Sequence, residues 1–246
     1  MNLKLQETYK LGKIAIQAGY RFFEEGKNVG FLFFDASVTA IEKTAKVKTL
    51  AGAVFLRGPS VAILVVLEDK TSDSSKGQPR QRVALTVQPR VAIGSLKFTE
   101  VVAGIHDGKT AKAVAEKELE QELGLKEAGI SLADGEMINL SELATPEKTG
   151  TGGDEHLPAG TFPSVGGSDE YIVYFLLRMK LPSKIIDGLD GRETGEFKEG
   201  EKINVKVVEL PKLMEVAAWD GKVAAVYGLS RHLQSKGEKK LEGLVF

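Results

Sequence analysis

The sequence contains no cysteine, and this absence removes several kinds of chemistry. Disulfide bonds, thiolate metal sites and a cysteine nucleophile are excluded, while reducing and oxidising compartments both remain open. An excess of either charge is also missing, because 33 basic side chains balance 34 acidic ones. The resulting net charge of −1 gives no general basis for binding nucleic acid or an anionic membrane.

Long hydrophobic segments are lacking as well. The longest apolar run covers residues 61–67, far short of the roughly 18–20 residues that span a bilayer. Residues 1–30 include three glutamates and no apolar core typical of a signal peptide. We therefore expect a soluble protein with no membrane partner, located in the cytoplasm or an organelle and not evidently secreted.

The composition that remains is typical of a globular protein, with 42% apolar and 27% charged residues. Near the N-terminus, apolar residues recur at intervals of three and four, which predicts an amphipathic helix over residues 3–25. From residue 30 the chain becomes rich in β-branched and aromatic residues, which predict strands. We expect this helix and β-rich segment to occupy residues 1–57, followed by a main domain over residues 58–246.

Several further segments of the main domain read as strands. The apolar run 61–69 predicts a strand buried on both faces. Other strands are expected at 82–90, 96–104, 135–145, 171–181 and 203–210, and a final helix should begin after Asp220 as its N-cap. Many strands with few inserted helices indicate an α+β class with a mixed sheet. The long loop over residues 146–170 is expected to line a site.

One stretch, AGIHDGKTAKAVAEKELEQELGL over residues 103–125, carries the strongest functional signal. Thr110 can cap a helix that Gly124 ends. On this helix Glu118 and Glu122 are one turn apart, so both carboxylates project from the same edge. That spacing suits a divalent cation held by carboxylates and substrate phosphate oxygens. A solvated acidic face, balanced by neighbouring lysines, is the alternative reading.

The same stretch resembles the Nudix box, the signature of the Nudix hydrolases. Its second half, Lys117-Glu118-Leu119-Glu120-Gln121-Glu122-Leu123-Gly124-Leu125, matches the family pattern with two substitutions. The first half departs further, since the turn is one residue short and Lys109 stands where the family has Glu. Flanking segments resemble the nucleotide-sugar diphosphatase branch, closest to the plant ADP-sugar diphosphatase type: VFLRGPSVAILVVLE, LTVQPRV, EVVAG, FPSVGGSDE and LDGRETGEFKEGEKINVKVVEL. The resemblance implies the Nudix fold, a mixed sheet between helices.

The resemblance also implies a set of metal ligands. Glu118 and Glu122 correspond to the family's metal-binding carboxylates, which are also catalytic, and the carbonyl of Ala103 corresponds to a further ligand. Gln121 replaces a third acid and can coordinate only through a neutral oxygen. Lys117 replaces an arginine and so loses its planar fork. The implied cofactor is Mg²⁺, or Mn²⁺ in its place.

Other positions correspond to residues that surround the substrate in relatives. Arg90 matches an arginine that approaches the diphosphate, Gln88 is its neighbour, and Glu100 precedes the Ala-Gly turn where relatives also carry Glu. Glu170 matches the acid of a late catalytic loop, and Asp169 lies beside it. Arg90 can equally be an ordinary strand-end residue, and the loop at 166–170 can be a plain turn.

Two functions follow from the resemblance. The first is a metal-dependent hydrolase that cleaves a nucleoside-diphosphate sugar, of ADP-ribose or ADP-glucose type, to a nucleoside monophosphate and a sugar phosphate. Relatives pair through the N-terminal β-rich segment, so a homodimer is expected. The second, favoured by the departures at Lys109, Lys117 and Gln121, is a catalytically impaired protein that serves as a binding or scaffold subunit of a larger assembly.

Overall fold

The computed structural model describes residues 9–21, 29–42, 46, 48–71, 80–106, 108–145, 157–197 and 200–246. The chain divides into two compact units. The first comprises Met1–Pro59 with Thr145–Ile172, and the second comprises Ser60–Ala144 with Val173–Phe246. Among the described residues, no helix has the length and apolar character needed to span a membrane.

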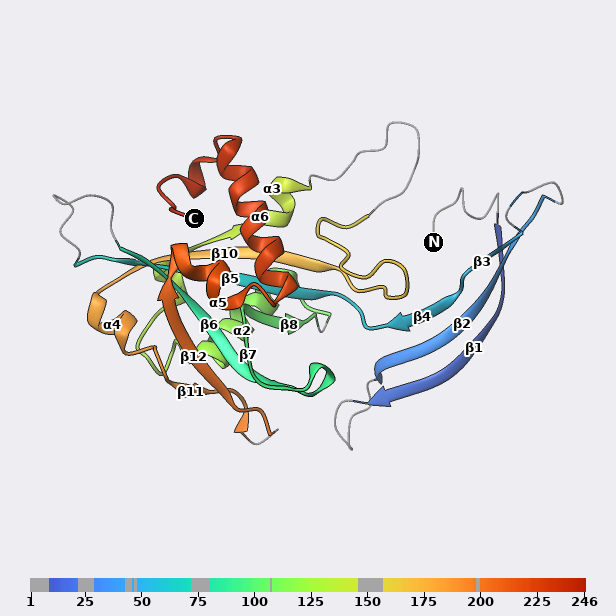
Figure 1. Ribbon diagram of the computed structural model, residues 1–246, viewed down its shortest axis with the longest axis horizontal. Coiled ribbons are helices and arrows are strands. Elements are labelled where there is room, and N and C mark those ends of the chain that lie inside the picture. The colour runs from blue at the N-terminus through green and yellow to red at the C-terminus, as the bar shows by residue number, and fades with distance from the viewer. Residues whose placement is uncertain are drawn as a thin grey trace. The chain divides into compact units, whose positions relative to one another are not determined.

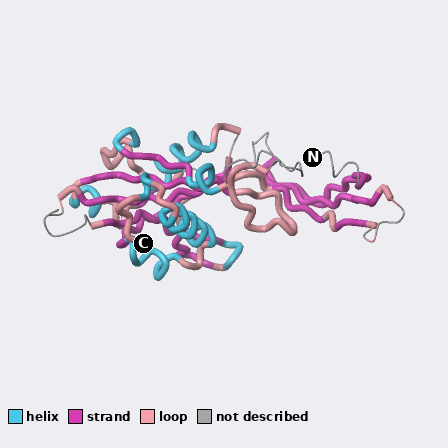
Figure 2. Tube along the Cα trace, turned by 90° about the horizontal axis from the view of Figure 1, so that it is seen from above, coloured by secondary structure: helices cyan, strands magenta, loops and turns pink. Residues whose placement is uncertain are grey.

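The described part of the first unit consists of strands and loops (Figure 2). Its sheet has four strands: β1 (Tyr9–Arg21), β2 (Val29–Ala40), β3 (Thr49–Leu50) and β4 (Ala53–Leu56). All pairings with β2 are antiparallel. The loop that precedes β10 joins this unit, because Phe55 donates its backbone N–H to the carbonyl of Gly167 at 2.7 Å.

The helix expected over residues 3–25 is wrong, because its described part is the strand β1. Two periodicities coexist in this segment, and the strand period prevails: Ile14, Ile16, Ala18 and Tyr20 alternate along the chain. Glycines within the segment weaken a helix, by about 1 kcal/mol each relative to alanine. Pairing with β2 along most of its length, with Ile16 opposite Phe34, decides the outcome. Sequence spacing alone does not contain this tertiary contribution.

The second unit is built around an eight-stranded sheet in the order β11-β12-β6-β5-β10-β9, with β7 added to β6 and β8 added to β5. The strands are β5 (Ser60–Asp69), β6 (Gln81–Arg90), β7 (Ser95–Glu100), β8 (Val102–Ile105), β9 (Gly135–Asn139), β10 (Ile172–Leu181), β11 (Glu193–Thr194) and β12 (Ile203–Glu209). The segment expected as one strand over 135–145 forms β9 and then turns into a short helix.

Helices cover both faces of this sheet, and Figure 1 shows α6 in front of β5 and α2 behind it. The helices are α2 (Ala111–Leu123), α3 (Leu140–Ala144), α4 (Ser183–Asp187), α5 (Leu213–Ala217) and α6 (Gly221–Ser235), joined by the 3₁₀ turns η2 (Val91–Ile93), η3 (Leu132–Asp134), η5 (Leu210–Lys212) and η6 (Lys239–Leu241). Every residue of β5 is buried, as predicted for a strand covered on both faces. The α+β class with a mixed sheet is confirmed.

Helices α2 and α6 begin where the sequence predicts, and α2 also ends there. The hydroxyl of Thr110 accepts the N–H of Ala113 at 3.2 Å, and α2 ends at Gly124, whose φ is 59°. This left-handed conformation suits glycine, which has no Cβ. Asp220 caps α6 by accepting the N–H of Lys222 at 2.9 Å. These caps fix which helix residues face the sheet.

Candidate metal and diphosphate site

The two predicted metal-binding carboxylates lie on α2, on the side that faces β8 and β6. Glu122 is buried, with 3% of its surface exposed, whereas Glu118, one turn earlier, is half-buried. Leu119 and Leu123 anchor the helix because both are fully buried against the sheet. The apolar stripe of α2 therefore holds both acids at the edge of the core.

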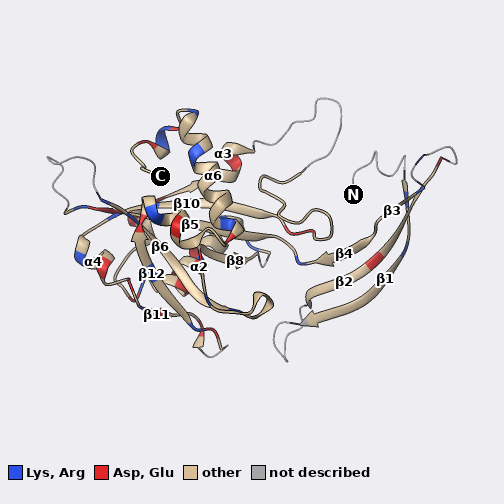
Figure 3. Ribbon diagram, viewed as in Figure 1, with Lys and Arg blue, Asp and Glu red and all other residues tan. Residues whose placement is uncertain are grey.

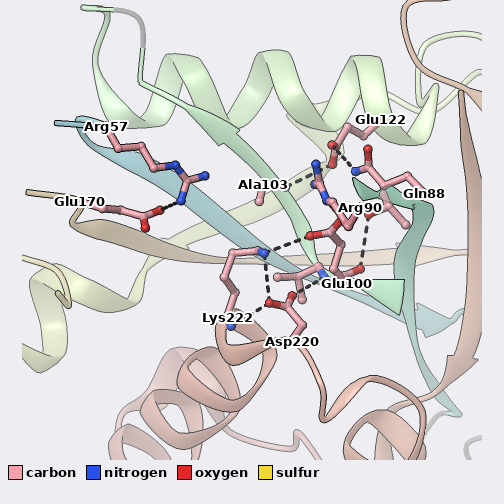
Figure 4. Close-up of polar contacts among 11 residues, drawn as sticks. Arg57, Gln88, Arg90, Glu100, Ala103, Glu122, Glu170, Asp220 and Lys222 are labelled. Atoms are coloured by element: carbon pink, nitrogen blue, oxygen red, sulfur yellow. Dashed lines mark hydrogen bonds and ion pairs between the residues drawn. The ribbon is translucent and has the colours of Figure 1, made fainter. Parts of the chain in front are cut away.

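Three groups of the second unit contact Glu122 directly. The backbone N–H of Ala103 donates to its Oε2 at 3.2 Å, and the Gln88 side chain donates to its Oε1 at 3.4 Å. The hydroxyl of Thr194 donates to its backbone carbonyl at 2.5 Å. Figure 4 shows Ala103 and Gln88 on either side of this carboxylate. The structure thus brings together Gln88, Ala103 and Glu122, and the roles that the resemblance implies for them stay predictions.

The electrostatic environment of Glu122 disfavours its charged form. Burial raises the pKa of this carboxyl well above its ordinary value, and the neighbouring Glu118 raises it further. The Ala103 N–H acts in the opposite sense, while Glu100 and Glu201 add smaller upward effects. A cation placed between these carboxylates would relieve the repulsion among them.

Strand β8 leaves room for the Glu118 side chain because residue 104 is glycine. A Cβ at Gly104 would lie 2.2 Å from Cδ and 2.4 Å from Oε1 of Glu118, closer than non-bonded atoms approach. The side chain of Glu118 thus occupies space that any other residue type would fill. This close approach explains the glycine at this position of the box.

The backbone of Ala103 also suits the ligand role that the resemblance implies. In an extended strand the N–H and C=O of one residue point to the same side. The N–H of Ala103 is directed at Glu122, so its carbonyl is directed to the same side of β8. The described residues include no cluster of three or more histidine or acidic side chains with metal-site geometry. Two carboxylates, one carbonyl and the oxygens of water or substrate still fit Mg²⁺, which commonly keeps several waters.

The Gln121 side chain contacts an acid from another part of the chain. Its side-chain N–H donates to Oε1 of Glu196, which follows β11, and the backbone carbonyl of Gln121 accepts the backbone N–H of Gly195 at 3.1 Å. The backbone N–H of Glu196 in turn donates to Glu201 at 3.4 Å. The structure thus brings two acids that the sequence analysis missed, Glu196 and Glu201, beside α2. A metal-ligand role for Gln121 stays a prediction.

Arg90 and Glu100 form one end of a connected chain of charges. Oε1 of Glu100 lies 2.7 Å from both Nε and an outer nitrogen of Arg90, and its Oε2 lies 3.0 Å from Nζ of Lys222. Nζ of Lys222 also lies 3.0 Å from Oδ1 of Asp220. Burial lowers the pKa of Lys222, but Asp220 and Glu100 outweigh this and raise it overall. Glu100 thus forms ion pairs with two basic side chains, Arg90 and Lys222. Its contact with substrate stays a prediction.

The predicted residues Asp169 and Glu170 belong to the first unit. Oδ1 of Asp169 accepts the backbone N–H of Arg57 at 2.7 Å and that of Gly58 at 3.0 Å. Glu170 forms an ion pair with the Arg57 side chain at 2.5 Å (Figure 4). Asp169 therefore fixes the end of β4, and Glu170 holds an arginine of the same unit. Their roles in catalysis and substrate binding stay predictions.

Comparisons with known proteins find similarity in sequence and in fold. The chain is 35% identical over 214 residues to Nudix hydrolase 14, chloroplastic, from Arabidopsis thaliana; the match covers 86% of this chain and 60% of that protein. This chain therefore spans only part of its relative. A solved structure of an ADP compounds hydrolase superposes with a TM-score of 0.50 and 11% sequence identity, over 94% of this chain and 97% of that one, which shows a shared fold. No protein-family model matches the sequence.

Proposed function

Because the chain belongs to the Nudix hydrolase family, we propose that it cleaves the diphosphate bond of a nucleoside-diphosphate sugar. The products would be a nucleoside monophosphate and a sugar phosphate. The observation that carries the proposal is the pair of carboxylates on one edge of α2, with buried Glu122 held by Ala103 and Gln88. The sequence resemblance to the ADP-sugar diphosphatase branch favours an ADP-ribose or ADP-glucose type of substrate, and the solved structure that shares the fold is named an ADP compounds hydrolase.

Glu118, Glu122 and the Ala103 carbonyl would hold Mg²⁺ or Mn²⁺ in this proposal. When bound, such a cation polarises phosphoryl oxygens and lowers the pKa of a coordinated water. Arg90 would bind the diphosphate, since its side chain is 42% exposed while Glu100 contacts one side of its guanidinium. A pocket of about 530 Å³ lies at the C-terminal end of α2 and is lined in part by Gln121, Arg192 and Phe197.

Two residues, Glu170 and Glu201, are candidates for the general base in this proposal. Glu170 is the residue that the family resemblance indicates. Glu201 is favoured by the second unit itself, because its charge acts on Glu122 and it borders the same helix through Glu196. The single substitutions Glu170→Gln and Glu201→Gln distinguish the two candidates. Only loss of the general base would remove the increase of kcat with pH.

The test of this function is a substrate panel with purified protein and Mg²⁺ or Mn²⁺. ADP-ribose, ADP-glucose and UDP-glucose should be compared, with release of nucleoside monophosphate as the readout and Glu122→Gln as the inactive control. Turnover that needs the metal and disappears in this variant is expected. No release from any compound, together with stable co-purification in a large complex, would instead favour a binding or scaffold subunit.

We also propose a homodimer formed through the first unit. Its strands β1 and β2 carry few charged residues (Figure 3), and several of their large apolar side chains are exposed: Ile14, Ile16, Tyr20 and Phe33. Exposed apolar clusters of this kind are typical of protein interfaces. Light scattering of the wild type and of Ile16→Lys tests the idea, because a charge inside an apolar interface should yield monomers.

A further inference from the structure

Lys222 occupies an unusual place for a cation. It lies in the first turn of α6, where the positive end of the helix dipole disfavours a positive side chain. Its side chain is only 23% exposed, so burial adds to that cost. Two carboxylates compensate: Oε2 of Glu100 and Oδ1 of Asp220, each 3.0 Å from Nζ. The two ion pairs, and not the helix dipole, therefore stabilise the Lys222 ammonium group at this position.

The contact with Glu100 reaches Arg90. Glu100 has 1% of its surface exposed, so its carboxylate orientation depends on its partners and not on water. Lys222 binds one oxygen, which leaves the other oxygen directed at Arg90. Figure 4 shows Lys222 and Arg90 on the two sides of Glu100. Asp220 is fixed in its turn by the backbone N–H of Val101 at 3.3 Å, so the chain of contacts ends on rigid backbone.

We propose that Lys222 is a positioning residue, which orients Arg90 for the substrate diphosphate by holding Glu100. The proposal rests on the proposed function, because Arg90 is taken to bind the diphosphate. Without Lys222 the buried carboxylate of Glu100 loses one of its two cationic partners. It can then rotate and meet Arg90 in a different orientation. The guanidinium then loses its fixed orientation, and the excess negative charge repels the diphosphate.

A double-mutant cycle separates this role from a direct one. The dissociation constant for an α,β-methylene analogue of ADP-ribose is measured in wild type, Lys222→Met, Arg90→Ala and the double variant. Lys222→Met should weaken binding about tenfold, as loss of a group that orients a ligand-binding residue commonly does. In the Arg90→Ala background the same change should have little effect. An equal loss in both backgrounds would overturn the proposal, because Lys222 would then act without Arg90.

Conservative and matched variants complete the experiment. Lys222→Arg should restore most of the affinity, while Lys236→Met, an exposed lysine just beyond α6, should leave it unchanged. Where a compound is hydrolysed, Lys222→Met should raise KM and leave kcat within about twofold. A fall in kcat with unchanged KM, or failure of the arginine variant to restore binding, would count against a positioning role.

A measurement without ligand distinguishes this inference from the proposed function. The Nε–Hε resonance of Arg90, assigned through Arg90→Lys, should shift or broaden in Lys222→Met and stay in place in Lys236→Met. If the wild type hydrolyses nothing but the resonance depends on Lys222, the function fails and the positioning stands. If the resonance is unchanged in Lys222→Met, the positioning role is wrong whatever the activity.

Discussion

The backbone N–H of Ala103 donates to Oε2 of Glu122 across 3.2 Å, although 19 residues separate them in the chain. This bond joins strand β8 to helix α2, which follows it in the chain. It satisfies a carboxylate that is otherwise costly to bury, since isolated buried charge is strongly disfavoured. The pKa of Glu122 is nevertheless raised, because the effect of burial is larger than that of this hydrogen bond.

Glu122→Gln should separate activity from stability. The neutral amide keeps the shape of the side chain but cannot balance a divalent cation, so Mn²⁺ affinity and kcat should fall by at least about 100-fold. At pH values where Glu122 is ionised, the metal-free variant should nevertheless melt at a higher temperature than the metal-free wild type, because the substitution removes a buried charge. Calorimetric titration and thermal denaturation in chelator check both. Glu116→Gln, on a half-buried position of the same helix, is the control, and a lower melting temperature for Glu122→Gln would contradict the idea.

The stability of the metal-free protein should depend on pH through the same residue. The pKa of Glu122 is raised in the folded state, so its contribution to stability is present below the unfolded pKa and is lost as pH rises through the folded pKa. The free energy of unfolding, measured with urea and chelator, should therefore decline from mildly acidic to neutral pH. This decline should be smaller in Glu122→Gln and in saturating Mg²⁺, which binds the ionised form. An identical pH slope in the variant would refute it.

Asp69 should show the opposite dependence. Hydrogen bonds from Thr71 lead in lowering the pKa of Asp69 to about 2, and Arg82 contributes from 3.8 Å. Its stabilisation is present above the unfolded pKa and disappears as pH falls through about 2. Asp69→Asn should cost about 1–2 kcal/mol at neutral pH and little in strong acid. Urea unfolding at both extremes, beside the exposed control Asp134→Asn, measures the difference.

The sequence predicted the parts of the site that local spacing encodes. Glu118 and Glu122 follow from helical periodicity, and the caps at Thr110 and Gly124 from residue type. Glu196 and Lys222 escaped prediction, since strand pairing and helix packing bring them to the site from distant parts of the chain. The strand at β1 was missed for a related reason: its pairing with β2 is tertiary, whereas spacing reports only local preference.

Gly104→Ala tests how closely strand β8 and helix α2 fit together. The added methyl would overlap the carboxyl of Glu118, whose flexible side chain must then move away from the site. We expect Mn²⁺ affinity to fall about 10–100-fold while the far-UV spectrum stays the same. Gly228→Ala, at a helical glycine with open space around it, should leave the affinity unchanged. Unaltered metal binding in Gly104→Ala would mean that Glu118 is not a ligand.

Gln121 offers the sharpest test of how the chain tolerates the loss of a family acid. Its amide donates to Glu196, so restoring the acid with Gln121→Glu would place two carboxylates in contact. We expect that variant to lose about 1–3 kcal/mol of stability without a gain in metal affinity. The exchange Gln121→Glu with Glu196→Gln keeps one amide and one acid, so stability should return and metal affinity should reach or exceed that of the wild type. If Gln121→Glu alone raises both, Glu196 is not its partner, and the substitution in the box is a simple loss of charge.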